Sequence, residues 1–184
     1  MKPVFPTCFA RASKLACLCG VLILLGGCSS SEFKTTREKA EKGDPKAQLE
    51  LGFMYLDGRG TKQSDAEGLR WCREAAEKGL PAAQRAYGLI LRDGIVGGRN
   101  LVLARQWLEK AATKGDVMAQ VELANTLAFS PPPQDYVEVM KWLILAEKAG
   151  STNAPAIIKQ VAPEMSPAEM SEARAKAEAF EKEK

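Results

Sequence analysis

Histidine is absent from this chain of 184 residues, and cysteine is scarce. Without histidine, Ser-His-Asp and Cys-His catalysis are excluded, as is imidazole ligation of a metal ion. Four of the five cysteines fall within the first 28 residues, so no cluster remains that could hold zinc. Hydrophobic residues make up 46% of the chain and charged residues 27%, which is typical of a globular protein. We therefore predict a protein without a metal or cofactor.

The apolar run at residues 15–25, LACLCGVLILL, is too short to span a bilayer comfortably. It follows three basic residues and ends at Gly-Gly-Cys28, with no acidic residue before Glu32. This order is typical of a signal peptide, and the junction LGGC at 25–28 resembles a bacterial lipobox. We predict that residues 1–27 are removed and that Cys28 carries the lipid. The alternative is a buried N-terminal helix.

Removal of the signal peptide changes the charge balance of the chain. Loss of Lys2, Arg11 and Lys14 lowers the number of basic residues from 26 to 23, which equals the number of acidic residues. A near-neutral mature protein argues against nucleic acid as a partner. Cys72 is then the one cysteine without a lipid, so an intramolecular disulfide is excluded.

A unit of about 36 residues recurs along the rest of the chain. Its glycine, Ala-Gln and tryptophan positions keep one spacing: Gly43, Gly79, Gly115 and a degenerate Gly150; Ala47-Gln48, Ala83-Gln84 and Ala119-Gln120; Trp71, Trp107 and Trp142. We predict a tether at 28–34, a repeat region at 35–150 with units 43–78, 79–114 and 115–149, and capping helices at 151–184.

Each unit is predicted to fold as two helices. Asp44, Asp116, Ser64 and Asn100 are candidate N-caps, and glycine-rich connections join the two helices of units one and two. Small residues recur where two helices must approach closely. Since neither helix can bury its apolar face alone, the units are expected to stack into an all-α, right-handed α-α superhelix.

The repeated motif resembles the Sel1-like repeat family, which is related to tetratricopeptide repeats. Unit one carries the pattern most completely, at Gly43, Ala47, Leu51, Gly52, Tyr55, Gly58, Gly60, Trp71, Ala75, Ala76 and Gly79. Unit three departs from it: Ala124 replaces a glycine, and SPPPQD at 130–135, with its prolines Pro131–Pro133, replaces the glycine loop. The resemblance implies a helical solenoid that binds other proteins.

Cys72 is a candidate nucleophile because it lies beside Arg73 and Glu74. Alignment of the second helices places it at the position of Leu108 and Leu143, and buried cysteine behaves as a small hydrophobic residue. No histidine is available to activate it. We therefore expect a core residue and no catalytic site.

The face of the first helices opposite Ala47, Leu51 and Tyr55 is the candidate partner-binding groove. It combines apolar side chains with two arginines, which suits a peptide or helix with an acidic element. The alternative is that the terminal helix folds back over it. The predicted groove residues are Leu49, Phe53, Leu56, Arg85, Leu89, Arg92, Val121 and Asn125.

Two functions remain open from the sequence. The first is a lipid-anchored scaffold of the bacterial envelope, expected at the outer membrane facing the periplasm, that binds an envelope protein or peptide. The second is a β-lactam-binding or hydrolysing enzyme, as the resemblance to cysteine-rich members of the family implies. Those members carry a cysteine pair in each repeat, which this chain lacks.

Overall fold

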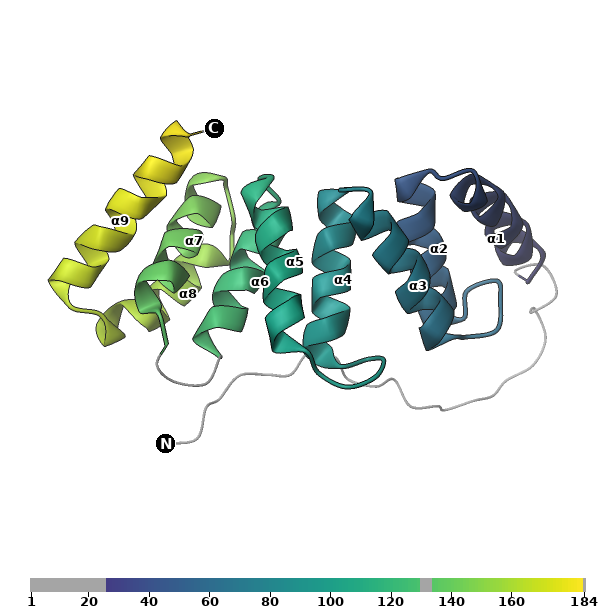
Figure 1. The fold of residues 1–184 in the computed structure, drawn as a ribbon, viewed down its shortest axis with the longest axis horizontal. Helices are drawn as coiled ribbons and strands as arrows, with labels where there is room; N and C mark the ends of the chain where they lie inside the picture. The colour runs from purple at the N-terminus through teal and green to yellow at the C-terminus, as the bar shows by residue number, and fades with distance from the viewer. Residues whose placement is uncertain (1–25, 130–133, 184) are drawn as a thin grey trace.

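The computed structural model describes residues 26–129 and 134–183, which form nine α-helices and one short 3-10 helix, with no strand (Figure 1). The three predicted units are three helix pairs between one N-terminal helix and two C-terminal ones. The helices are α1 (Gly26–Glu41), α2 (Pro45–Asp57), α3 (Asp65–Glu77), α4 (Pro81–Asp93), α5 (Leu101–Thr113), α6 (Val117–Ala128), α7 (Tyr136–Lys148), α8 (Ala154–Val161) and α9 (Pro167–Lys182), with the 3-10 helix η1 at Ala162–Glu164.

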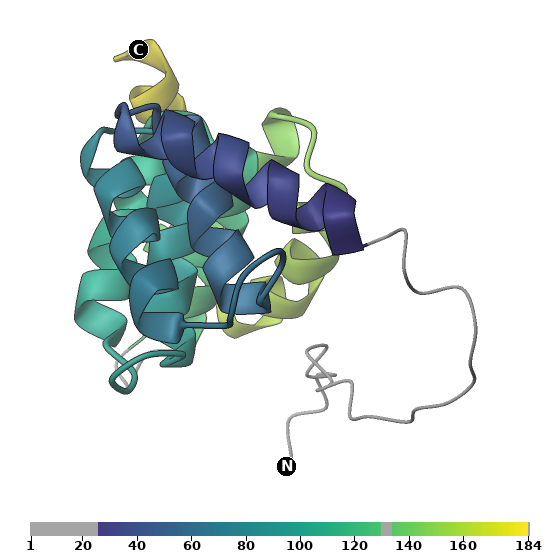
Figure 2. The ribbon, with the colours of Figure 1, turned by 90° about the vertical axis from the view of Figure 1, so that its right-hand side faces the viewer.

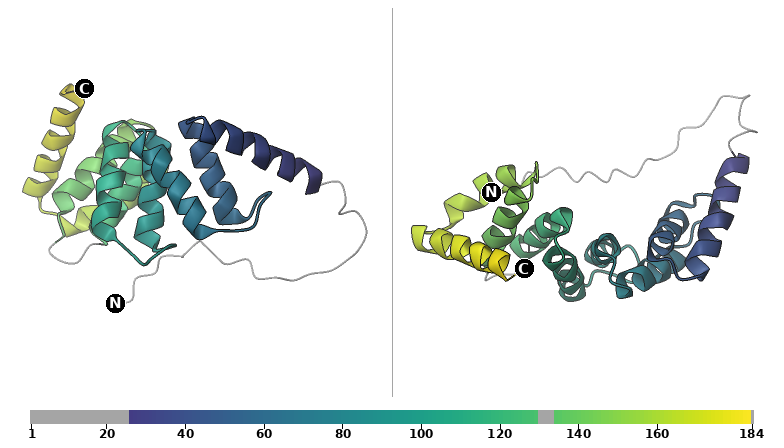
Figure 3. Two further views of the ribbon diagram at one scale, coloured as in Figure 1. Left: turned by 45° about the vertical axis from the view of Figure 1, so that its right-hand side comes forward. Right: turned by 90° about the horizontal axis from the view of Figure 1, so that it is seen from above.

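The helix pairs stack along an arc as a right-handed superhelix, which confirms the predicted fold class (Figures 2 and 3). The turns from each unit to the next lie along the upper edge in Figure 1, and the connections within units one and two lie along the lower edge. Helix α4 contacts both α2 and α6, the first helices of the neighbouring units. Elements on the inside of an arc are the most crowded, so these contacts place the first helices on the inner side.

Side-chain caps start the helices where the sequence predicts them. Asp44, Ser64, Asn100 and Asp116 each accept a hydrogen bond from a backbone N–H of the first turn, which satisfies a donor that the helix itself leaves free. The turns from one unit to the next depend on left-handed backbone conformation, with φ from 86° to 92° at Gly43, Gly79, Gly115 and Gly150. Glycine adopts this conformation without a steric penalty.

Within unit one, α2 and α3 pack backbone against backbone. A Cβ atom added at Gly52 would lie 2.5 Å from the Sγ of Cys72, and one at Gly68 would lie 2.9 Å from the carbonyl oxygen of Gly52. Ala75 and Ala76 are fully buried in the same helix. The predicted role of small residues at close helix contacts is therefore confirmed.

The two ends of the solenoid are covered by helices. Helix α1 packs on α2, and α9 packs on α7, where the rings of Trp142 and Phe180 meet edge to face at 5.3 Å. Residues 28–34, predicted as a tether, lie within α1. Residues 1–25 of the predicted signal peptide, 1–27, and the prolines Pro131–Pro133 lie outside the described residues.

Candidate functional site

Cys72 lies in the core and offers no reactive thiol. Its side chain is fully buried against Gly52, and burial raises the pKa of the thiol to about 12, because the thiolate is poorly solvated there. At neutral pH the sulfur is therefore protonated and a poor nucleophile. The predicted structural role of Cys72 agrees with this environment, and the thiol gives the β-lactamase alternative no support.

The inner face of the first helices brings the predicted groove residues onto three neighbouring helices. On α2, Phe53 is partly exposed, whereas Leu49 and Leu56 pack partly against the core cluster formed by α3, α4 and α5. On α4, Leu89 is partly buried against the core cluster that runs from α5 to α9. Helix α6 contributes Val121, which is 8% exposed and belongs to that core, and Asn125, which is partly exposed. The apolar surface is thus smaller than the sequence pattern suggests.

The two groove arginines are held by acidic residues of the next unit. Arg85 of α4 donates to both carboxylate oxygens of Asp116, at 3.1 and 3.2 Å. Arg92 donates to Glu122 of α6 at 2.5 Å and to its neighbour Asp93 at 2.8 Å. Both arginines therefore join unit two to unit three, and an acidic partner group would have to compete with these carboxylates.

The terminal helix does not fold back along the groove. Helix α9 packs mainly on α7, through Trp142 and Phe180 and through the ion pairs Lys148–Glu181 and Lys176–Glu138. It does not pack along α2, α4 or α6 in the part of the chain that the structure describes. Among the described residues, α9 therefore leaves the inner face of the first helices largely uncovered.

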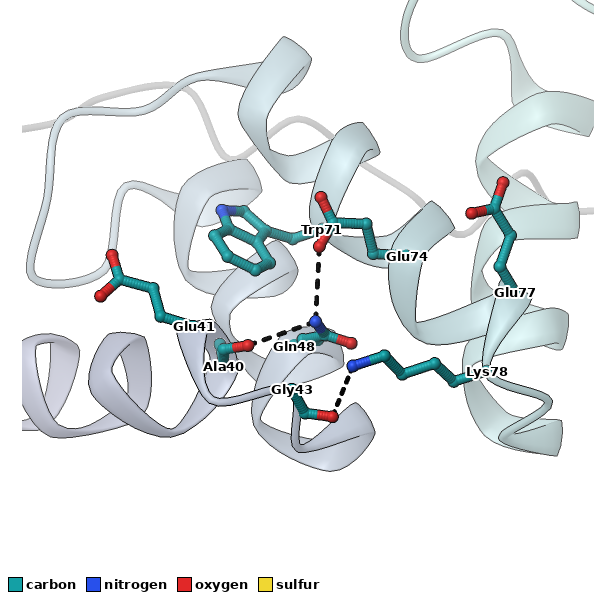
Figure 4. A pocket seen from close by; sticks show the side chains of 8 residues that line it. All are labelled: Ala40, Glu41, Gly43, Gln48, Trp71, Glu74, Glu77 and Lys78. Atoms are coloured by element: carbon teal, nitrogen blue, oxygen red, sulfur yellow. Dashed lines mark hydrogen bonds between the residues drawn. The ribbon is translucent and has the colours of Figure 1, made fainter.

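A second recessed surface, which the sequence did not suggest, lies on the edge where successive units join. The first notch, with a volume of about 350 Å³, opens between the end of α1, the start of α2 and the end of α3. Figure 4 shows Gln48 at its centre, between Trp71, Glu74 and Lys78. The residues that line it are Ala40, Glu41, Gly43, Gln48, Trp71, Glu74, Glu77 and Lys78.

A second notch of about 500 Å³ opens one unit further along the same edge. Each of its lining residues lies 36 positions after a lining residue of the first notch. They are Ala76, Glu77, Gly79, Gln84, Trp107, Lys110, Thr113 and Lys114. The repeat period could have suggested paired sites, but the sequence alone does not show that the side chains leave a recess.

Neither a metal centre nor a membrane-spanning helix is found within residues 26–129 and 134–183. There, no three cysteine, aspartate or glutamate side chains come together in a way that could hold a metal ion. None of the described helices has the length and apolar character needed to cross a bilayer. Cys28, the predicted lipid-attachment residue, lies in the first turn of α1, and its side chain is outside the description.

Comparisons with known proteins agree with the helix-pair architecture. The Sel1 repeat family model matches residues 45–80 and 81–116. A solved Sel1 repeat protein from Oxalobacter formigenes is 32% identical, with a TM-score of 0.63, and the match covers 70% of this chain and 98% of that one. A search of the curated proteins gave no match.

A second solved structure shows the same fold at lower identity. It is a protective antigen of uropathogenic Escherichia coli with an SLR fold, 24% identical, with a TM-score of 0.70. The match covers 82% of this chain and 34% of that protein. Because the Oxalobacter relative is matched along nearly its whole length at 32% identity, this chain belongs to the Sel1 repeat family.

Proposed function

We propose that this protein is a lipid-anchored scaffold of the bacterial envelope that binds a protein partner through the inner face of its first helices. The observation that carries the proposal is the open inner face, where Phe53 and Leu89 are partly exposed on neighbouring units and α9 leaves them uncovered. Apolar side chains in a concave helical surface suit an amphipathic helix or an extended peptide.

The ion pairs across units two and three refine the chemistry expected of the partner. Arg85 and Arg92 already have carboxylate partners in Asp116 and Glu122, so the partner's acidic group would exchange with an existing pair. Such an exchange adds specificity more than affinity. The main contribution to affinity is therefore assigned to apolar contact with Phe53.

The membrane anchor rests on the N-terminal sequence. The basic start, the apolar run at 15–25 and LGGC at 25–28 support lipidation of Cys28. Ser29, rather than aspartate, follows the cysteine, which fits release to the outer membrane, facing the periplasm. Helix α1 would then begin close to the lipid.

Fractionation tests the anchor. A Cys28→Ala variant should lose detergent-dependent membrane association and accumulate as the unprocessed or soluble form. The same mature size and the same outer-membrane fraction for both chains would contradict lipid anchoring at Cys28.

Site-specific photocrosslinking in the native cell envelope tests the groove. A benzophenone amino acid at position 53 should give a discrete crosslinked product. The matched control places it at position 102, because Val102 is 73% exposed on α5, a second helix. Equal products from both positions, or none from position 53, would contradict the inner-face assignment.

A further inference from the structure

Exposed apolar side chains gather on the lower edge of the solenoid in Figure 1, which carries the connections within units one and two. Among the described residues, the large apolar side chains that are exposed are Ile95 at 49%, Val102 at 73%, Met118 at 60% and Phe129 at 68%. Ile95 lies in the connection between α4 and α5, Val102 lies in the first turn of α5, and Phe129 ends α6, which runs toward the same edge. Met118 begins α6 at the opposite edge. Three of the four side chains therefore share one edge, as is typical of an interaction surface.

The connection of unit two differs in composition from that of unit one. Residues 94–100 read GIVGGRN, with one charged residue, whereas residues 58–64 read GRGTKQS and are polar. A Cβ atom added at Gly97 or Gly98 would meet no atom within 4 Å, so the tip of this connection stands clear of the rest of the molecule. A protruding apolar tip suits insertion into a deformable surface, such as the headgroup region of a bilayer.

Two arginines border these apolar side chains. Arg99 is exposed, and its Nε donates to the carbonyl oxygen of Arg92 at 2.9 Å, which uses one of the five donors of the guanidinium group. Arg105 is exposed three residues after Val102, on the same side of α5. Neither Arg99 nor Arg105 forms an ion pair within the part of the chain that the structure describes. Because guanidinium groups bind phosphate with paired hydrogen bonds, cations beside apolar side chains suit a lipid surface.

The predicted lipid-attachment residue lies near the same edge. Arg59, in the connection of unit one, pairs with Glu32 of α1 at 3.9 Å. Cys28 precedes Glu32 by about one turn of the same helix. A lipid on Cys28 would therefore bring the bilayer to the start of α1, beside the edge that carries the exposed apolar side chains.

We propose that this edge lies on the membrane surface, with Ile95 and Val102 in the headgroup region and Arg99 and Arg105 on lipid phosphates. The proposal rests on the lipid anchor at Cys28, since so small a contact is too weak to hold the protein at a bilayer by itself. The contact orients the solenoid. Its upper edge points away from the bilayer, and the inner face of the first helices opens sideways to a partner (Figure 3).

Chemical coupling tests the contact without depending on lipidation in the cell. The mature chain, which begins at Cys28, is coupled through that thiol to maleimide lipid in vesicles of phosphatidylethanolamine and phosphatidylglycerol. Cys72 is fully buried and should not react. A benzophenone amino acid at position 95 should give a product heavier by one phospholipid on illumination. The matched control places it at position 118, which is exposed on the opposite edge and should give little or none of this product.

Substitutions test the chemistry of the contact. With the probe at position 95, Val102→Glu should lower the yield of the lipid product about tenfold, because a carboxylate is costly at the hydrocarbon boundary. Met118→Glu should leave the yield unchanged. Arg99→Gln with Arg105→Gln should lower the yield more on these anionic vesicles than on vesicles of phosphatidylcholine alone. Since all these side chains are exposed, thermal unfolding should be the same for every variant.

Equal lipid products from positions 95 and 118, no lipid product from position 95, or an unchanged yield in Val102→Glu would each overturn the proposal. Membrane retention of the Cys28→Ala chain in cells would instead contradict the anchor, and the vesicle result would still decide whether the edge contacts lipid. In the cell envelope, a probe at position 102 should acquire one phospholipid and no protein, so it remains a control for position 53.

Discussion

Units one and two use equivalent positions 36 residues apart, yet they differ in the side chains at the contact between their two helices and in how each unit joins the next. In unit one, Gly52 and Gly68 let α2 and α3 meet backbone to backbone, with Cys72 between them. In unit two, the counterpart of Gly68 is Ala104 and that of Cys72 is Leu108, and both are fully buried. The two helices approach similarly in both units, since a Cβ atom added at Gly52 or at its counterpart Gly88 would lie 3.1 or 3.2 Å from the carbonyl oxygen of Gly68 or Ala104.

The junctions between units differ in polarity. Where unit one meets unit two, Leu49 and Leu80 both pack against the core cluster formed by α3, α4 and α5. At the equivalent positions of the next junction, Arg85 and Asp116 form an ion pair. The repeat motif therefore determines which positions meet, while the residues outside the motif determine the chemistry of the contact. A partner that contacts several units would meet a different surface on each one.

The largest expected effect comes from giving unit one the helix contact of unit two. Gly68→Ala places a Cβ atom 2.9 Å from the carbonyl oxygen of Gly52 and 2.6 Å from the Cγ of Leu56. Because a backbone atom cannot rotate away, α2 and α3 must separate, and we expect the free energy of unfolding to fall by about 2–3 kcal/mol. Urea denaturation of both chains measures the change.

The reverse substitution in unit two is the control for Gly68→Ala. Ala104→Gly removes a methyl group and lowers helix propensity, at a cost of about 1 kcal/mol. Gly68→Ala should therefore lower the free energy of unfolding more than Ala104→Gly does. A Gly68→Ala protein as stable as wild type would show that the close approach in unit one is not required.

A smaller effect is expected from giving the second junction the apolar residue of the first. Asp116→Leu removes the N-cap of α6, where the carboxylate accepts from the N–H of Ala119 at 2.9 Å, and leaves Arg85 without this partner. We expect a loss of about 2 kcal/mol in the free energy of unfolding, measured by thermal or urea denaturation.

The double variant Arg85→Leu/Asp116→Leu sharpens that comparison. This variant removes the unpaired cation Arg85 and places two leucines at the positions equivalent to Leu49 and Leu80. It should therefore have a higher free energy of unfolding than Asp116→Leu alone, although α6 still lacks its N-cap. If the double variant is less stable than the single one, the two junctions are not interchangeable.

The repeat period was sufficient to predict the fold, the helix pairs and most of the caps. Matched positions such as Trp71, Trp107 and Trp142 identify units without any knowledge of contacts, and aligning Cys72 with Leu108 correctly predicted its burial. These features depend on local sequence and on a period that the chain repeats.

The parts that the sequence did not predict depend on side chains from separate units. Helical periodicity places Arg85 and Arg92 on the inner face, but it does not show that Asp116 and Glu122 lie close enough to pair with them. The notches likewise need three helices and the volumes of their side chains. Helix α1 extends back through residues 28–34, where the polar run SSSEFK contains no start signal as clear as Asp44.

The smallest effect concerns the pH dependence that Cys72 gives unit one and that Leu108 cannot give unit two. The folded thiol has a pKa of about 12 against an ordinary value of 9.0. Above pH 9 the thiol of the unfolded chain therefore loses its proton, while the thiol of the folded chain keeps it. The contribution of this thiol to the free energy of unfolding is present in full below pH 9 and falls as the pH rises toward 12. The slope is at most about 1.4 kcal/mol per pH unit. Urea denaturation of wild type and Cys72→Ala from pH 8 to 9.5, where the loss stays below about 1 kcal/mol, isolates this contribution, because all other groups titrate in both chains. Stability curves that stay parallel above pH 9 would mean that the thiol is not buried from solvent in the folded protein.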